Sequence, residues 1–149
     1  MKLKIIPNEQ TPKIIDHKSL DKLLTEDRKL LEKFISFCQQ RKDCAGLAAN
    51  QIAVDGQRIM EPFFTAKDRN GWEIFIHPEI ILYEGSKATK EEGCLTWQWK
   101  TIIAERYESV LIRYYNLRGE QIKRKATGFE AQVIQHEMNH LLGIAETFK

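Results

Sequence analysis

The sequence lacks the features that would place this protein in a membrane or on a nucleic acid. No apolar run approaches the roughly 20 residues that a transmembrane helix needs. The N-terminal segment Met-Lys-Leu-Lys-Ile-Ile-Pro has neither the long apolar stretch nor the small-residue cleavage site of a secretion signal. A net charge of +2 over 149 residues gives no reason to expect nucleic acid or an anionic membrane as a partner. We therefore expect a cytoplasmic protein, and a monomer is the simplest expectation.

Linkers, repeats and a paired set of cysteines are also missing. With no Gly/Ser-rich stretch and no repeat, residues 1–149 are interpreted as a single catalytic domain with one core. The three cysteines, Cys38, Cys44 and Cys94, are an odd number without a secretion signal, which argues against a disulfide framework. Cys38 fits a small buried side chain on a helix face. At least one thiol is free for another use.

Apolar periodicity predicts an α+β fold. Ser19 is a candidate N-cap of one long N-terminal helix that runs to about Gln40. Short runs rich in Ile, Val, Tyr and Trp follow, and their close spacing favours antiparallel pairing. The predicted strands are Trp72–His77, Glu79–Glu84, Thr101–Glu105, Ser109–Tyr115 and Gln121–Lys125, with a hairpin turn at Asn116–Gly119 before the last.

The last predicted element is a helix. Thr127 with Glu130 three residues later is a capping-box signature, and Gly143 stands where a C-terminal cap is expected. The expected fold therefore has mostly antiparallel sheets around this late helix. The helix also carries the main chemical motif, from which a metal site is predicted below.

That motif is His136-Glu137-Met138-Asn139-His140, an H-E-x-x-H pattern. Residues four apart lie on one helix face, so both imidazoles can reach one ion while Glu137 can move a proton on a neighbouring water. His17 and His77 stand alone and are interpreted as structural or surface residues. A catalytic metal usually has three protein ligands, so the chain must supply a third.

Two residues compete for the role of third ligand. Glu146 completes H-E-x-x-H-x-x-G-x-x-E, which is close to the metzincin protease pattern and keeps a metalloprotease as an alternative function. The chain stops three residues later, at Lys149, which leaves no segment for the Met-turn of such a protease. Cys94, in a loop between two predicted strands, would instead give a Cys-His-His site. Beside the helix motif, the cysteine is the better candidate.

Three stretches resemble the polypeptide deformylase family, in the family's order and at about its spacing. Residues 44–51, Cys-Ala-Gly-Leu-Ala-Ala-Asn-Gln, are similar to G-x-G-x-A-A-x-Q. Residues 92–96, Glu-Gly-Cys-Leu-Thr, are similar to E-G-C-L-S/T, and residues 135–141, Gln-His-Glu-Met-Asn-His-Leu, to Q-H-E-x-D-H-L. Together the three are highly specific.

The resemblance implies an enzyme that acts near the ribosome, removes the formyl group from the N-terminal formylmethionine of nascent polypeptides, and releases formate. It implies Fe²⁺ as the first choice of metal, with Zn²⁺, Ni²⁺ or Co²⁺ as alternatives. The implied roles are metal ligation by Cys94, His136 and His140, acid–base catalysis by Glu137, and donation to the formyl oxygen by Gln51 and the Leu95 amide.

The substrate would bind beside these residues. Phe129, Gln132 and Val133 are the implied methionine pocket, although Phe129 and Val133 are equally good core candidates. The peptide backbone would add a strand to the Cys44–Leu47 segment, which includes Gly46. Cys44 and Asn139 depart from the family's Gly and Asp, so a metal-binding relative without activity stays a further alternative.

Overall fold

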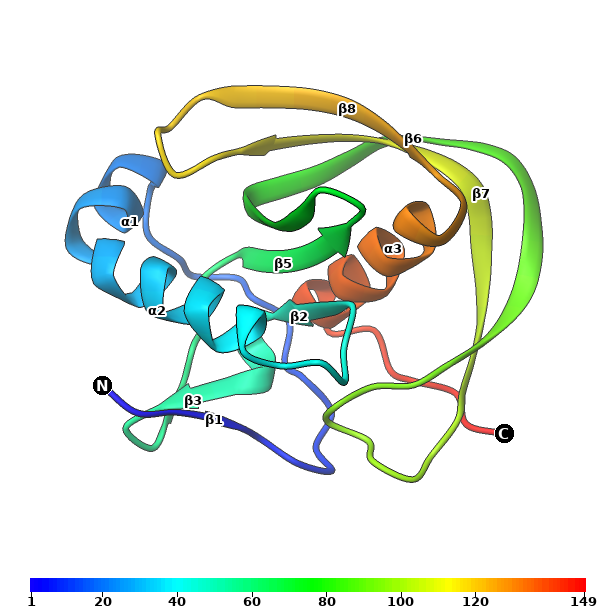
Figure 1. The fold of residues 1–149 in the computed structure, drawn as a ribbon, viewed down its shortest axis with the longest axis horizontal. Coiled ribbons are helices and arrows are strands. Elements are labelled where there is room, and N and C mark those ends of the chain that lie inside the picture. Colours follow the sequence, from blue (N-terminus) through cyan, green and yellow to red (C-terminus); the bar gives the residue numbers. More distant parts are fainter.

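Two antiparallel sheets and three α-helices make up the computed structural model, which describes residues 1–149 (Figure 1). The larger sheet has the strand order β2-β5-β6-β7-β8, and the smaller has the order β1-β3-β4. The larger sheet consists of β2 (Gly46–Ala48), β5 (Phe63–Asp68), β6 (Gly71–Glu92), β7 (Ile102–Tyr115) and β8 (Gln121–Thr127). The smaller consists of β1 (Leu3–Ile5), β3 (Ile52–Val54) and β4 (Gln57–Arg58). The predicted α+β class with antiparallel sheets is confirmed.

The two longest strands are longer than the sequence predicts. Pro78 and Gly85 were expected to end strands, but β6 continues through both and pairs with β7, with register shifts between Ile76 and Glu79 and between Glu84 and Lys87. Such irregularities let a strand accommodate a proline, which has no N–H, and a glycine at φ +79°. The predicted strands on either side therefore merge, and β6 curves around α3 (Gly128–Leu142) (Figure 1).

The prediction of one long N-terminal helix is wrong. The segment forms two helices, α1 (Leu20–Glu26) and α2 (Arg28–Gln39), which meet at Asp27. Asp27 leaves the helical conformation, with φ −112° and ψ 20°, and its carboxylate accepts a hydrogen bond from Lys18 Nζ at 2.8 Å. Aspartate has a low helix propensity, which makes it more common at helix ends than in helix interiors. Ser19 does cap α1, since its Oγ accepts from the Lys22 N–H.

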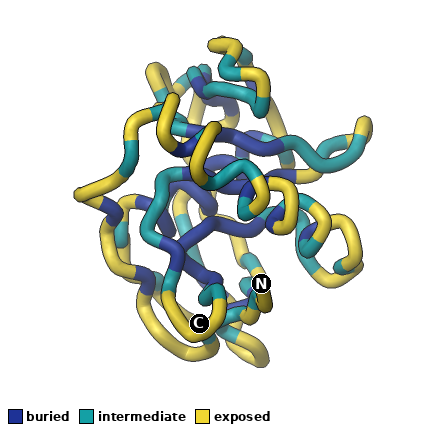
Figure 2. Tube along the Cα trace, turned by 90° about the vertical axis from the view of Figure 1, so that its left-hand side faces the viewer, coloured by how far each residue is buried: buried dark blue, intermediate teal, exposed yellow.

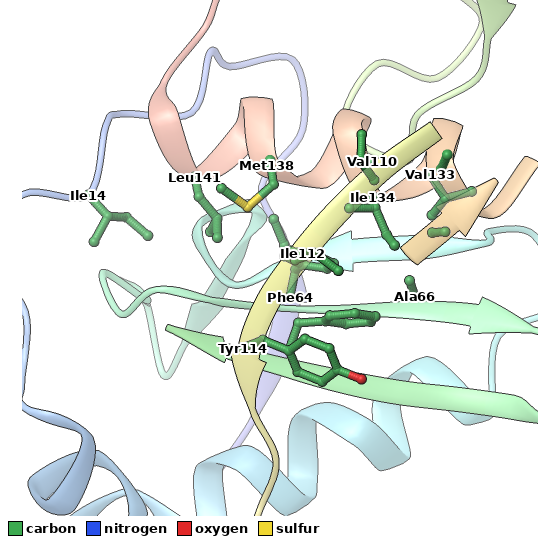
Figure 3. Close-up of a cluster of buried hydrophobic side chains, with 14 residues drawn as sticks. Ile14, Phe64, Ala66, Val110, Ile112, Tyr114, Val133, Ile134, Met138 and Leu141 are labelled. Carbon is green, nitrogen blue, oxygen red and sulfur yellow. The ribbon is translucent and has the colours of Figure 1, made fainter. Parts of the chain in front are cut away.

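The larger sheet separates two hydrophobic clusters. Alternation along β5 places Phe64 in a cluster with α3 and Phe63 in a cluster with α2. Figure 3 shows Met138 and Leu141 of α3 pointing toward the strands. Cys38 is fully buried in the other cluster, as expected for a structural thiol. In Figure 2 the buried segments run through the middle of the molecule and the exposed ones around its edge.

The capping box predicted at the start of α3 does not form, whereas the predicted C-cap does. Thr127 is the N-cap residue, but its side chain makes no capping hydrogen bond, and Glu130 pairs with Arg124 instead. At the other end Gly143 adopts φ +67°, the left-handed conformation expected of a C-cap glycine. A short η1 helix (Ala49–Gln51) follows β2 next to α3. None of the helices has the length and apolar character needed to cross a bilayer.

Candidate metal site and active site

The fold brings together the three side chains that the sequence singles out as a metal site. His136 and His140 lie one turn apart on α3, and Cys94 lies in the loop between β6 and β7. The two Nε2 atoms are 3.1 Å apart, and Cys94 Sγ lies 3.4 Å from His140 Nε2. All three ligand atoms fall within 4.8 Å of one another. The packing of α3 against the sheet therefore brings together ligand residues that are more than forty positions apart in the sequence.

The orientation of both imidazoles suits a shared cation. His136 Nδ1 lies 2.7 Å from the Glu92 carboxylate, and His140 Nδ1 lies 3.4 Å from Thr11 Oγ1. Thr11 uses its own proton on the His140 carbonyl at 2.9 Å, so its oxygen is free to accept from the ring. With Nδ1–H engaged on both rings, the Nε2 lone pairs face the same point. Two imidazole nitrogens and a sulfur suit a first-row divalent metal.

Burial controls the protonation of the second histidine. His140 is only 2% exposed. This burial, together with the neighbouring His136, lowers the pKa of His140 well below its ordinary value. A neutral ring is the form that binds a metal.

Glu92, at the end of β6, contacts His136 at Nδ1, the ring nitrogen that does not face the other two ligands. Its carboxylate accepts hydrogen bonds from Arg106 Nη2 and Nε at 2.7 and 2.9 Å, and from Gln132 Nε2 at 2.9 Å. Burial opposes ionisation of Glu92, but the hydrogen bonds from His136 and Arg106 outweigh it and lower its pKa to about 2. The ionised carboxylate fixes the His136 ring. Sequence reasoning gave Glu92 no role, because its partners come from β7 and α3.

Glu137 lies beside the three ligand atoms, in contact with β2. It is 4% exposed, and its Oε1 makes no hydrogen bond within the chain. Burial raises the pKa of Glu137 to about 7. A Cβ at Gly46 would lie only 2.7 Å from Glu137 Oε2, so glycine is what allows β2 to pass this carboxylate. A carboxyl group that titrates near neutral pH inside a pocket is suited to proton transfer.

Gln51, the last residue of η1, presents its side-chain amide to the site. Its Oε1 accepts from the Ala48 N–H at 2.8 Å. Its Nε2 donates to Thr96 Oγ1 at 3.0 Å and contacts Cys94 Sγ at 3.4 Å. This arrangement fixes which end of the amide faces the metal ligands. Leu95, directly after Cys94, is 9% exposed and also lines the adjoining pocket.

A pocket of about 590 Å³ opens beside the ligand cluster. It contains all five residues that the sequence assigns to substrate binding: Cys44, Gly46, Phe129, Gln132 and Val133. Phe129 is 64% exposed and belongs to the pocket, not the core, whereas Val133 belongs to both.

The two tryptophans after Cys94 have different environments. Trp97 packs against Phe148, with ring centroids 5.1 Å apart. Trp99 is fully exposed at the pocket, at φ +69°. Trp97 therefore has a packing role, and Trp99 does not.

An H-E-x-x-H helix with a third ligand from a neighbouring loop defines a class of metal-dependent hydrolases, and comparisons identify the family. The family model for polypeptide deformylase matches residues 10–147. The chain therefore belongs to the polypeptide deformylase family. The peptide deformylase of Thermotoga maritima is 33% identical over 117 residues, which are 78% of this chain and 68% of that protein. That of Desulforudis audaxviator is 38% identical over 105 residues, 70% of this chain and 66% of that protein.

Solved structures agree with the family assignment. The crystal structure of the Thermotoga maritima peptide deformylase matches with a TM-score of 0.79 and 29% identity, over 97% of this chain and 94% of that one. The actinonin-bound class I type b enzyme from Acinetobacter baumannii matches with a TM-score of 0.76 and 25% identity, over 94% and 92% of the two chains. This chain is a metal-dependent hydrolase that removes the formyl group from N-formylmethionyl peptides.

Proposed function

We propose that Cys94, His136 and His140 hold the divalent metal of this deformylase and that Glu137 is its acid–base residue. The convergence of the three ligand atoms within 4.8 Å, next to a buried carboxyl group, is the observation that carries the proposal. The bound ion would supply a lowered pKa for a neighbouring water and a positive charge beside the formyl oxygen. Proton transfer, stabilisation of the formyl oxygen and binding of the peptide are assigned to side-chain and backbone groups of the chain.

Glu137 moves the proton. With its pKa raised to about 7, it accepts a proton from the attacking water and passes it to the departing amine nitrogen. Gln51 Nε2 and the Leu95 N–H donate to the formyl oxygen as it gains negative charge. Loss of one such donor typically costs about 2.7–4 kcal/mol of transition-state stabilisation.

The substrate peptide is proposed to lie along β2. This strand is at the edge of the larger sheet, with β5 as its only neighbour, so its other edge can pair with an extended peptide. The methionine side chain would enter the pocket between Phe129 and Val133. Gln132 donates a 2.9 Å hydrogen bond to Glu92. Its polar amide is therefore engaged by Glu92 and not by the methionine side chain of the substrate.

The metal is proposed to be Fe²⁺, with Zn²⁺, Ni²⁺ or Co²⁺ as substitutes, because a Cys-His-His donor set accepts all four. Activity of protein purified without oxygen, followed by metal analysis, tests this choice. Loss of activity in air together with loss of iron would support Fe²⁺. An air-stable activity with stoichiometric zinc would contradict it.

The biological setting follows from the substrate class. We propose that residues 1–149 act as one catalytic domain and as a monomer on nascent formylated chains, near the ribosome in the cytoplasm. Both hydrophobic clusters pack on faces of the same sheet, which supports a single domain. Size-exclusion chromatography with light scattering tests the monomer.

Formate release from formyl-Met-Ala-Ser tests the proposed reaction. Glu137→Gln should lower kcat/KM by about 10²–10⁴-fold, the usual contribution of a general acid–base, while keeping the bound metal. Glu105→Gln removes an exposed carboxylate on β7 and serves as the matched control with unchanged turnover. A metal-loaded wild-type protein that releases no formate would favour an inactive relative, and internal cleavage of a denatured protein would favour a protease.

A further inference from the structure

Trp99 is a large apolar side chain that the fold leaves in solvent beside the active site. Its ring is fully exposed, whereas tryptophan is largely buried in most folded proteins. Its backbone has φ +69°, a conformation that costs a bulky side chain free energy. An exposed side chain in a strained conformation contributes little to folding, so the position of Trp99 calls for a role outside folding.

The loop that carries Trp99 is fixed on both sides of this residue. It joins β6 to β7 and lies at the lower edge of Figure 1. Before Trp99, Thr96 is buried and its carbonyl accepts a hydrogen bond from the Asn8 N–H at 2.8 Å. After Trp99, the Lys100 ammonium lies 4.8 Å from the centroid of the Phe148 ring. The neighbours of Trp99 therefore hold it at the pocket, without burial of its own ring.

The walls of the pocket place Trp99 beside the proposed path of the peptide. One wall is formed by residues 43–46, a second by residues 91–99 and a third by α3. Successive side chains of an extended peptide point to opposite sides. If the methionine points toward Phe129 and Val133 of α3, the next side chain points away from α3, toward solvent. Trp99 is the only exposed apolar side chain of the second wall.

The charged groups at the rim of the pocket are already paired. Its two exposed carboxylates are Asp43, which lies 2.9 Å from Arg41 Nη2, and Glu91, which lies 2.8 Å from Lys149 Nζ. The rim therefore presents no unpaired charge that would select a charged side chain. Discrimination between substrates at this point depends on the apolar surface of Trp99.

We propose that Trp99 is a specificity-determining residue that contacts the side chain of the residue after formylmethionine. The indole ring covers a large apolar side chain at this position, and both groups lose exposed apolar surface. Glycine at the same position offers the ring nothing to cover. The enzyme therefore prefers N-formylmethionyl peptides whose second residue is large and apolar. The inference rests on the proposed placement of the peptide along β2.

Steady-state formate release from formyl-Met-Leu-Ser and formyl-Met-Gly-Ser tests this contact. Trp99→Gly should raise KM for the leucine peptide about tenfold, the effect of a lost apolar contact, and should leave KM for the glycine peptide nearly unchanged. Its kcat should stay at the wild-type value for both peptides, because the contact is equally strong in the ground state and the transition state.

Two further variants serve as controls. Trp99→Phe keeps an aromatic ring and should retain most of the preference for leucine. Ile15→Ala removes an exposed apolar side chain that does not line the pocket, and it should match wild type with both peptides.

Urea unfolding of Trp99→Gly separates substrate contact from a structural role. Its midpoint should stay close to that of wild type, because relief of the strain at φ +69° offsets the greater freedom of glycine in the unfolded chain. Equal rises in KM for the two peptides, or no rise for either, would overturn the inference while formate release continues. Release from neither peptide by metal-loaded wild type would mean that the proposed site itself fails.

Discussion

Gly46 and Glu137 meet so closely that β2 has no room for a side chain at this point. A Cβ at Gly46 would lie 2.7 Å from Glu137 Oε2 and 2.8 Å from Val133 Cγ1. Gly46→Ala should therefore displace the Glu137 carboxylate, lower formate release at least tenfold, and cost about 1–3 kcal/mol of stability through overpacking. Steady-state kinetics and urea unfolding measure the two effects.

Gly93 offers a matched control for this prediction. A Cβ there has nothing within 4 Å, and the residue does not require a positive φ. Gly93→Ala should therefore unfold at the urea concentration of wild type. Equal losses of stability in the two variants would mean that the close approach at Gly46 is not the cause.

Several site residues follow from local sequence and others do not. Helical spacing alone predicts that His136, Glu137 and His140 share one face, and the need for a third ligand narrows the choice to Cys94 and Glu146, of which Cys94 is the better candidate. Thr11 and Glu92 orient the two histidines, yet no local pattern marks them, because their contacts join the N-terminal segment and the end of β6 to α3. The supporting partners of a metal site depend on tertiary packing.

At the scale of single elements, the C-terminal end of α3 makes a specific prediction. Gly143 has φ +67°, and a Cβ there would lie 2.6 Å from the backbone nitrogen of Lys13. Gly143→Ala should destabilise the protein by more than the roughly 1 kcal/mol of left-handed strain alone. Gly56→Ala isolates that strain, because Gly56 has φ +86° and open space around it. Urea denaturation of both variants gives the difference, and equal losses would contradict the contact with Lys13.

The predicted secondary structure is correct where a single local signal determines the conformation, and it is wrong where two signals compete. The Asn116–Gly119 turn joins β7 to β8 as predicted. The N-terminal helix breaks at Asp27, whose carboxylate pairs with Lys18, although the apolar helical periodicity continues past this residue. Pro78 and Gly85, which usually punctuate strands, lie inside β6 because β7 supplies a partner along nearly its whole length. β5 was not predicted, since its buried run Phe63–Ala66 lacks apolar alternation.

At the scale of the whole molecule, the proposed metal site connects parts of the chain that are distant in sequence. Cys94 follows the end of β6, while His136 and His140 belong to α3, so an ion bound only by the folded chain stabilises it by mass action. At a free metal concentration 100-fold above Kd, the gain is about 2.7 kcal/mol. For a chain of this size, removal of the metal should lower Tm by about 5–10 °C. Calorimetry with and without a chelator measures the shift, and Cys94→Ser should show little of it.

The exposed position of Trp99 gives the molecule a built-in optical reporter. The indole is fully exposed at the mouth of the pocket, whereas Trp97 packs on Phe148 and Trp72 belongs to the cluster around α2. A peptide that fills the pocket would remove water from Trp99 and leave the other two indoles in place. Fluorescence emission should then move to shorter wavelength, and occupancy could be followed in real time without a label.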